Sequence, residues 1–338
     1  MAAETFLVLG SNSFSGATFV ATVLEAGADV VGISRSPEPD EALLPYKWAS
    51  HGDHDGGPRG RFTFHALDFN HDLDRIEAVI QEVRPEYIVN FAAQGMVAQS
   101  WEHPEHWYQT NVVATARLVD RLWRMPFVRK FVQASTPEVY GSTHGIVRET
   151  TPFNPSTPYA VSKAACDMNL LAYQRARGFP VAFTRAANVC GPGQQLYRII
   201  PRTILCVLSG RKLRLEGGGT TRRSFIHMDD VANGTFAVAR YGTPGEAYHL
   251  ATDHMQTIRE VVGEICRQMD VAFDDVVETT PARLGENPAY ELDCTKARRE
   301  LGWQPRWSFE ETVAATIEWT RRNLDRLRRM PTEYVHQA

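Results

Sequence analysis

The sequence predicts an α/β protein with a doubly wound parallel sheet and a smaller, mixed lobe toward its C-terminus. In the first half, short apolar runs alternate with longer segments of helical periodicity, an order that requires crossovers between parallel strands. A turn rich in glycine and serine follows the first apolar run and leads directly into a helical segment. After Asn188 the alternation weakens, and glycine and proline turns interrupt the helical pieces.

The expected elements follow in order along the chain. Strands are predicted at Thr5–Leu9, Val30–Ile33, Phe62–Ala66, Tyr87–Phe91, Phe127–Ala134 and Val181–Thr184. Helices are predicted at Phe14–Ala26, Asp72–Val83, Asn111–Trp123 and Tyr159–Arg177, and later at Ile199–Ser209, Ile258–Met269 and Phe309–Asp325. We therefore expect a dinucleotide-binding Rossmann domain over residues 1–187, joined by 224–251, and a substrate lobe formed by 188–223 and 252–330.

Composition and charge argue against several classes of protein. The chain has 338 residues, 43% of them hydrophobic, which is enough for a large core. Its net charge of -4 provides no basic field for nucleic acid, and no apolar window approaches the ~20 residues of a membrane span. The cysteines are scattered without metal-ligand spacing, and the start lacks the pattern of a signal peptide. We expect a cytoplasmic protein without metal, nucleic-acid or membrane partners.

The turn after the first predicted strand is a candidate phosphate site. Backbone N–H groups at a helix N-terminus favour a pyrophosphate, and this turn opens directly into a helix. Ser13 occupies the position of the middle glycine in the usual GxxGxxG pattern. The expected contributors are Gly10, Asn12, Ser13, Phe14, Ser15 and Gly16.

The residues after the second strand bear on the form of the cofactor. NAD-binding proteins place Asp or Glu there, against the ribose hydroxyls, whereas this chain has Ser34, Arg35 and Ser36. A guanidinium and two hydroxyls suit a 2′-phosphate, so NADP is predicted, with NAD as the alternative if Arg35 is only a surface residue. Further cofactor contacts are expected after the later strands, at Asp68, Phe69, Phe91, Ala92, Ala93, Gln94, Asn111 and Ala134.

Tyr159 and Lys163 are the candidate catalytic pair. They stand four residues apart, so they share one face of the predicted helix. A free tyrosine has a pKa near ~10 and is a poor base at neutral pH, whereas a neighbouring cation stabilises the phenolate. Both residues also belong to the predicted cofactor contacts. The pair predicts oxidation of an alcohol carbon by hydride transfer to the dinucleotide.

Several runs of residues together resemble one enzyme family. They are Phe91–Trp101, Gln109–Val112, the Thr136 and Glu138 segment, Tyr159–Lys163, Arg185–Pro192, Arg222–Val231 and Leu292–Trp303. Over nearly its whole length the chain resembles the extended short-chain dehydrogenase/reductases that modify nucleotide sugars, especially the nucleotide-sugar 4,6-dehydratases. The resemblance implies a tightly bound, recycled cofactor and a homodimer formed through the helices near Asn111–Trp123 and Tyr159–Arg177.

The resemblance also implies roles for individual residues. Thr136 would hydrogen-bond the 4-oxygen of the sugar, Tyr159 would take its proton, and Lys163 would hold the nicotinamide ribose while lowering the tyrosine pKa. Glu138 would remove the C5 proton, unless it is a solvent-facing glutamate at a strand end. Asn188 and Arg223 would contact the diphosphate. Further substrate contacts are implied for Gln94, Met96, Ser135, Arg198 and Arg283.

Two departures from the family pattern leave alternatives open. Pro137 stands where many 4,6-dehydratases have an acidic Asp, although GDP-mannose 4,6-dehydratases also lack it, and Cys190 stands where relatives usually have Tyr. The predicted reaction is conversion of a nucleotide hexose to a 4-keto-6-deoxyhexose with loss of water. The alternatives are a nucleotide-uronate decarboxylase, a 4-epimerase or a non-catalytic NADP-sensing protein on the same fold.

Overall fold

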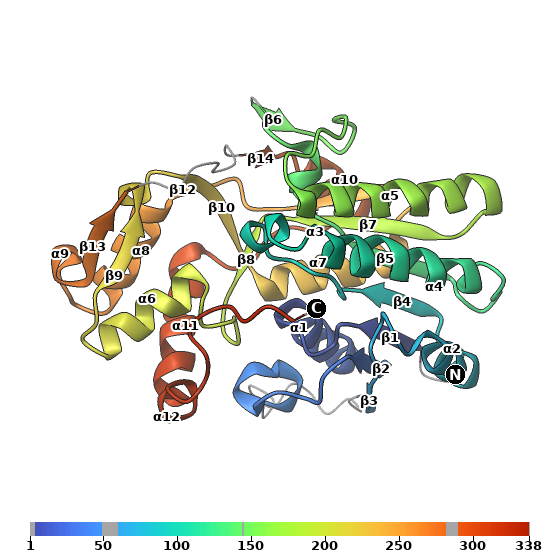
Figure 1. Cartoon of the computed structure of the whole chain (residues 1–338), viewed down its shortest axis with the longest axis horizontal. Helices are drawn as coiled ribbons and strands as arrows, with labels where there is room; N and C mark the ends of the chain where they lie inside the picture. Colours follow the sequence, from blue (N-terminus) through green and yellow to red (C-terminus); the bar gives the residue numbers. More distant parts are fainter. Residues whose placement is uncertain (1–3, 49–59, 144, 282–289, 338) are drawn as a thin grey trace.

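The central sheet contains only parallel pairings. The computed structural model describes residues 4–48, 60–143, 145–281 and 290–337. Within them the sheet has seven strands in the order β3, β2, β1, β4, β5, β7, β11 (Figure 1). Their bounds are β1 Thr5–Leu9, β2 Asp29–Ser34, β3 Phe62–Ala66, β4 Tyr87–Asn90, β5 Lys130–Ala134, β7 Val181–Ala186 and β11 Ala247–Leu250. This order confirms the predicted doubly wound fold.

Helices cover both faces of this sheet. On one face lie α1 (Phe14–Glu25) and α7 (Met228–Tyr241); on the other lie α2 (Leu73–Val83), α4 (Thr115–Leu122) and α5 (Pro158–Arg177). Alternate residues of β1 enter different cores: Phe6 and Val8 pack with α1 and α7, whereas Leu7 and Leu9 pack with α2, α4 and α5. A strand buried on both faces needs a continuous apolar run, which is why Thr5–Leu9 lacks polar alternation.

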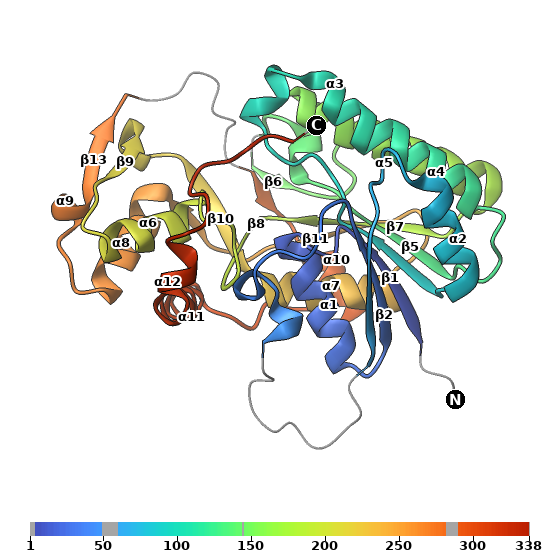
Figure 2. The same cartoon turned by 60° about the horizontal axis from the view of Figure 1, so that its bottom comes forward.

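The second lobe lies to one side of the sheet (Figure 2). Strands β8 (Asn188–Cys190), β10 (Arg222–His227) and β12 (Met255–Thr257) form one small sheet, and β9 (Leu213–Glu216) pairs with β13 (Val277–Thr280). Helices α6 (Ile199–Leu208), α8 (Ile258–Gln268), α9 (Phe273–Val276), α11 (Phe309–Arg322) and α12 (Leu324–Leu327) pack around them. The lobe has its own apolar core, which includes Ile204, Ile265 and Ile317.

The remaining elements connect the two parts. Strand β6 (Ile146–Val147) pairs with β14 (Glu291–Leu292), and α10 (Thr295–Leu301) contacts α7 and β11. Ala187 alone separates β7 in the main sheet from β8 in the second lobe, and β10 runs directly into α7. None of the helices in the described ranges has the length and apolar character needed to span a bilayer.

Some predicted boundaries were wrong. Strand β5 begins at Lys130 rather than Phe127, because a turn after Pro126 precedes it and Val128 donates its N–H to the Met125 carbonyl. The helix expected from Asn111 starts earlier, at α3 (Pro104–Trp107), and continues through a π-helical segment (Tyr108–Ala114) into α4. Apolar residues alone did not separate a strand from the buried turn before it.

Candidate active site

The glycine-rich turn after β1 brings three segments into close contact. Gly10 has φ +78°, and a Cβ there would lie 2.7 Å from the Ala92 nitrogen. A Cβ on Gly16 would lie 2.1 Å from the Gly10 carbonyl oxygen. Ser13 is the N-cap of α1, and its hydroxyl accepts a 3.0 Å bond from the Gly16 N–H. The N–H groups of the first turn, at Phe14 and Ser15, have no acceptor within the helix, so this turn fits a pyrophosphate.

Asn12 and Ser34 hold the turn against the end of β2. The Ser34 hydroxyl accepts from the Asn12 N–H at 3.0 Å, and the Asn12 Nδ2 donates to the carbonyl of Ser36 at 3.0 Å. The Ser34 hydroxyl is therefore engaged within the protein. Among the described residues the buried Oδ1 of Asn12 has no hydrogen-bond partner, so it is available to accept from a ribose hydroxyl.

Other predicted cofactor residues have structural partners. The Phe69 side chain lies in the core, while the Asp68 Oδ1 accepts from the Asn70 N–H at 2.7 Å. Asn111 accepts from the Gln94 N–H at 2.9 Å, donates to its carbonyl at 3.1 Å and also donates to the Ser162 hydroxyl at 2.9 Å. Asn111 thus ties the loop after β4 to α5. The predicted contacts Phe91, Ala92 and Ala93 begin that loop.

Thr136, Glu138 and Tyr159 lie together where β5 and α5 meet. The Thr136 hydroxyl caps the short 3₁₀ turn Pro137–Tyr140 and accepts from the Glu138 N–H at 3.3 Å. Tyr159 stands in the first turn of α5, whose N-cap Thr157 accepts from the Ala160 N–H at 3.1 Å. Burial and the Glu138 carboxylate raise the pKa of Tyr159, and a hydrogen bond with Thr136 lowers it. The structure therefore brings the phenol, the hydroxyl and the carboxylate together.

Lys163 follows Tyr159 by about one turn of α5. It is buried, its Nζ donates to the Ala134 carbonyl at 2.7 Å, and burial lowers its pKa. The family resemblance implies that Lys163 lowers the tyrosine pKa, yet in the protein alone the pKa of Tyr159 lies above its ordinary value. The reason is that burial outweighs the hydrogen bond from Thr136 and the charge of Arg198.

Two arginines of the second lobe act electrostatically on Glu138. Arg198 stands at the N-cap of α6 and Arg223 lies in β10. Burial raises the pKa of Glu138, and the charges of Arg223 and Arg198 lower it. Glu138 is therefore a partly desolvated carboxylate facing cations rather than a solvent-facing glutamate. Both arginines therefore bring positive charge to the surroundings of Glu138.

Tyr290 belongs to the same group, although sequence analysis missed it. Its side chain is buried just before β14, its pKa is raised by burial and by Glu138, and Arg223 lowers it. No motif surrounds this tyrosine, and only the pairing of β14 with β6 brings it to the site. The predicted substrate residue Arg283 lies outside the described residues.

The other predicted substrate residues have different surroundings. The Ser135 hydroxyl donates inward to Asp167, and Asn188 is the first residue of β8, paired with Phe225. Met96 is partly buried in the loop after β4. Gln94 donates from its Nε2 to the carbonyl of Gln337 at 2.7 Å.

The C-terminal segment, residues 331–337, runs from the second lobe to the sheet domain (Figure 2). On the second lobe, Glu333 pairs with Arg202 at 3.2 Å. On the sheet side, the Gln337 carbonyl accepts from Gln94 and, at 3.4 Å, from the Arg35 guanidinium. Sequence analysis did not anticipate this segment. It contacts two residues that are predicted to bind the cofactor.

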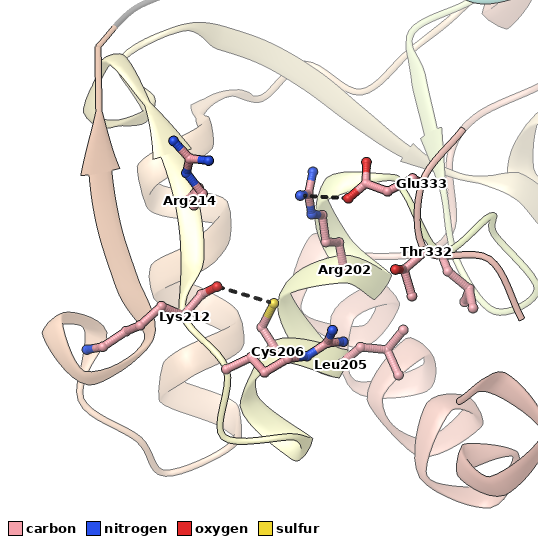
Figure 3. A pocket seen from close by; sticks show the side chains of 9 residues that line it. Arg202, Leu205, Cys206, Lys212, Arg214, Thr332 and Glu333 are labelled. Atoms are coloured by element: carbon pink, nitrogen blue, oxygen red, sulfur yellow. Dashed lines mark hydrogen bonds and ion pairs between the residues drawn. The ribbon is translucent and has the colours of Figure 1, made fainter. Parts of the chain in front are cut away.

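A small pocket on the second lobe is separate from this centre (Figure 3). Arg202, Cys206, Lys212 and Arg214 line it together with Thr332 and Glu333 of the C-terminal segment. None of the four candidate catalytic residues contributes to it. It therefore supports the packing of the segment rather than the chemistry at Tyr159.

The parallel sheet, its glycine-rich first turn and the Tyr159 and Lys163 helix define an extended short-chain dehydrogenase/reductase. The family model described as GDP-mannose 4,6 dehydratase matches residues 7–316. The chain belongs to this family, and the predicted resemblance to nucleotide-sugar 4,6-dehydratases is confirmed.

Individual relatives agree with the family. A dTDP-glucose 4,6-dehydratase of Streptomyces antibioticus is 38% identical over 253 residues, covering 75% of this chain and 74% of the relative. Another, of Neisseria gonorrhoeae, is 30% identical, covering 94% of this chain and 95% of the relative. The structure of the Streptomyces venezuelae dTDP-glucose 4,6-dehydratase DesIV, solved with NAD bound, has a TM-score of 0.83 and 32% identity, covering 95% and 98% of the two chains.

Proposed function

We propose that this chain converts a nucleotide hexose to the corresponding 4-keto-6-deoxyhexose, with loss of water and no net redox change. The observation that carries the proposal is the position of Glu138 beside Tyr159 and Thr136. Oxidation at C4 needs only a base for the hydroxyl proton. A second base within the same centre suits removal of the C5 proton, which the C4 ketone makes acidic.

The roles of the residues follow from their surroundings. Thr136 donates to or accepts from the 4-oxygen of the sugar, and Tyr159, already hydrogen-bonded to Thr136, takes the hydroxyl proton. Glu138 takes the C5 proton, and the hydroxyl at C6 accepts a proton, for which the neutral Tyr290 phenol is the candidate donor, and leaves as water. Arg198 and Arg223 hold the diphosphate, with Asn188, Gln94 and Met96 completing the substrate site. A guanidinium suits this role because it offers two parallel donors to phosphate oxygens.

A nicotinamide dinucleotide fits the sheet edge. When bound, it accepts a hydride from C4 of the sugar and supplies one to C6. The turn at Gly10 and Gly16 admits a pyrophosphate where a Cβ would not fit, and the Asn12 Oδ1 is available for a ribose hydroxyl. Lys163, fixed by the Ala134 carbonyl, would hold the nicotinamide ribose.

NAD is the form we propose, and NADP is the alternative that Arg35 favours. The structure of DesIV was solved with NAD. In this chain the Ser34 hydroxyl oxygen accepts from the Asn12 N–H, so the Ser34 O–H is still able to donate to a 2′-phosphate and this contact does not decide between the two forms. The NADP expectation stays a prediction that rests on Arg35.

The decisive experiment is the Glu138→Gln variant with a panel of nucleotide hexoses. The amide keeps the shape of the carboxylate but cannot accept the C5 proton, so reduced cofactor and the 4-keto hexose should accumulate while water loss falls by about 10² to 10⁴ fold. Tyr159→Phe is the matched variant, and it should bind substrate yet form little reduced cofactor. Mass spectrometry and cofactor absorbance separate the two steps.

The wild-type products separate the rival functions. In deuterium oxide the dehydratase should deliver a product that has lost one water and carries deuterium at C5. Release of carbon dioxide from a nucleotide uronate would support a decarboxylase instead, and an unchanged mass with inversion at C4 would support an epimerase. Dehydration by Glu138→Gln at the wild-type rate would refute the role of Glu138.

We also propose a homodimer in the cytoplasm. Helix α5 and the π-helical segment that precedes α4 expose Tyr108, Val161 and Met168, the last at 61%, on the side of the molecule expected to pair. The cysteines within the described ranges are all free, which suits a reducing compartment. Light scattering of Met168→Glu against the wild type tests the dimer, because a charge there should favour the monomer.

A further inference from the structure

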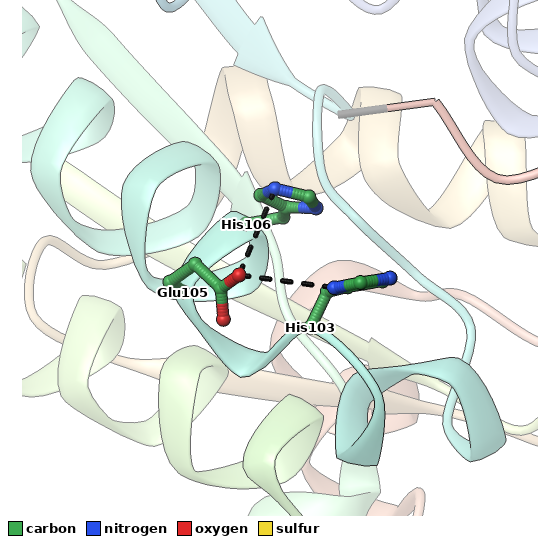
Figure 4. Close-up of side chains that lie close together, drawn as sticks. All are labelled: His103, Glu105 and His106. Carbon is green, nitrogen blue, oxygen red and sulfur yellow. Dashed lines mark ion pairs between the residues drawn. The ribbon is translucent and has the colours of Figure 1, made fainter.

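Three potential metal ligands lie close together just before the π-helical segment (Figure 4). They are His103, in the loop before α3, and Glu105 and His106 within α3. The His103 Nδ1 lies 3.8 Å from Oε1 of Glu105, and the His106 Nε2 lies 3.9 Å from the same oxygen. The ligand atoms all lie within 4.8 Å of one another. The side chains of His103 and Glu105 are 52% and 67% exposed, so an ion from solvent can reach them.

The separations between these ligand atoms are somewhat larger than a small bound cation requires. Zn²⁺ binds imidazole nitrogen and carboxylate oxygen at about 2.0–2.2 Å, so neighbouring ligands of a tetrahedral ion stand roughly 3.3–3.6 Å apart. The two nitrogen-to-oxygen distances of 3.8 and 3.9 Å need to close by only a few tenths of an ångström. The two imidazole nitrogens, which lie within 4.8 Å of each other, need to approach by up to about 1.5 Å, a movement that exposed side chains allow. Two imidazoles and one carboxylate favour Zn²⁺ over Mg²⁺ or Ca²⁺, which prefer oxygen ligands.

A further imidazole, from the C-terminal segment, completes the surroundings of His106. The His336 Nε2 lies 2.9 Å from the His106 Nδ1, and the His336 Nδ1 lies 3.2 Å from the Tyr334 hydroxyl. The His336 ring also stacks on Trp107, at 5.1 Å between centroids and 12° between planes. The Nδ1 of His106 is therefore directed at His336, and its Nε2 is directed at Glu105.

This arrangement has the pattern of a ligand with an outer hydrogen-bond partner. A histidine that binds a metal through one nitrogen carries its proton on the other, and that N–H is usually donated to an acceptor nearby. With an ion on the His106 Nε2, its Nδ1–H would donate to the His336 Nε2. The His336 Nδ1–H could then donate to Tyr334. With the ion bound, the tautomers of both histidines are therefore fixed, with one proton on the His106 Nδ1 and one on the His336 Nδ1.

We propose that His103, Glu105 and His106 bind one Zn²⁺ ion and that His336 is the hydrogen-bonded partner of His106 in this site. Because His336 belongs to the segment 331–337, the ion would fasten that segment to the sheet domain, where the Gln337 carbonyl contacts Gln94 and Arg35. The site lies outside the catalytic group. Sequence analysis predicted no metal because it considered only the spacing of cysteines.

The test uses tag-free, full-length protein from which metals have been removed with a chelator. Calorimetry with Zn²⁺, and absorbance with Co²⁺ as a spectroscopic substitute, should show one ion per chain. His103→Ala and His106→Ala should each abolish stoichiometric binding. His336→Ala should weaken it by about 10 to 100 fold, the effect expected for loss of an outer partner. His254→Ala, at an exposed histidine elsewhere, is the control and should bind like the wild type.

Each outcome decides part of the proposal. Absence of a one-to-one ion in the wild type, or equal binding by His103→Ala and the wild type with intact circular dichroism, overturns the site. Hydrogen exchange of residues 331–337 should slow when Zn²⁺ is added to the wild type but not to His336→Ala. Equal exchange with and without the ion overturns the fastening of the segment. Neither measurement depends on turnover.

Discussion

The hydroxyl of Ser135 donates a 2.6 Å hydrogen bond to Oδ2 of Asp167. The same carboxylate oxygen accepts from Arg185 at 2.8 Å, and both side chains of this ion pair are almost completely buried. Asp167 also opposes the effect of burial on the pKa of Lys163. Ser135, the residue after β5, is thereby fixed to α5, the helix that carries Tyr159 and Lys163. This bond holds the end of β5 and the start of the Thr136 segment at a fixed position relative to that helix.

Asp167→Asn should therefore destabilise the protein strongly. It leaves the buried Arg185 without its counter-charge, which costs about 3–5 kcal/mol of unfolding free energy. Denaturant unfolding measures the change. The matched control is Asp120→Asn, whose ion pair with Arg124 is more than half exposed on both sides, so its loss should change the unfolding free energy far less. Similar losses in the two variants would contradict the importance of the buried pair.

Arg223→Gln should move the acid limb of the pH profile of kcat to higher pH. If Glu138 is the C5 base, it accepts the proton only when ionised, so kcat should fall as pH drops through its pKa. Burial already raises that pKa, and the charge of Arg223 lowers it, so removing the charge raises it further. Arg222→Gln, at the exposed neighbouring residue, should leave the limb in place. If the acid limb of Arg223→Gln does not move, Glu138 is not the group whose ionisation limits kcat.

Tyr290→Phe should slow water loss more than C4 oxidation. Pro137 provides no acid for the departing C6 hydroxyl, whereas the Tyr290 phenol, kept neutral by burial and by Glu138, lies within the same group. Loss of a general acid should cost about 10²-fold in the elimination step. Reduced cofactor should build up during single turnover, as in Glu138→Gln. Equal slowing of oxidation and elimination would point to a packing defect instead.

Arg35→Ala separates the two forms of the cofactor. The guanidinium would pair with the charged 2′-phosphate of NADP, whereas NAD has an uncharged hydroxyl at that position. The variant should therefore lose about tenfold or more in NADP affinity and little in NAD affinity. Fluorescence titration of reduced NAD and reduced NADP measures both. Equal losses for both forms would mean that Arg35 acts through the C-terminal segment it contacts. Cofactor released from the native protein identifies the physiological form.

The sequence predicted most of the central sheet because interior strands such as β1 and β4 are buried on both faces, although β3 at one edge is partly exposed and β11 at the other edge was not predicted. Thr5–Leu9 and Phe62–Ala66 have the same bounds in the structure as in the prediction. The start of β5 was misplaced because Phe127 and Val128 are apolar turn residues. The strands of the second lobe were not predicted. Strands β8, β9, β12 and β13 have only three or four residues, which carry too little periodicity, and β10 begins with Arg222, Arg223 and Ser224 and lacks an alternating apolar pattern.

The catalytic group could be predicted in part. Thr136, Glu138, Tyr159 and Lys163 lie in recognisable motifs, and the structure brings the first three together. Tyr290 and His336 carry no motif, and each reaches its place through contacts between segments far apart in the sequence. The inward direction of the Ser135 hydroxyl depends on Asp167 and Arg185, which no local pattern connects to it.

The short links between β7 and β8 and between β10 and α7 limit how this enzyme could be recombined with its relatives. The second lobe is built from chain segments on either side of α7 and β11, both of which belong to the main sheet and its covering helices. A single recombination point between two genes would join part of one protein's second lobe to the rest of another's. Exchange of the whole lobe requires that both of its chain segments be replaced together. New substrate preferences in this family should therefore arise mainly from point substitutions within the lobe rather than from domain shuffling.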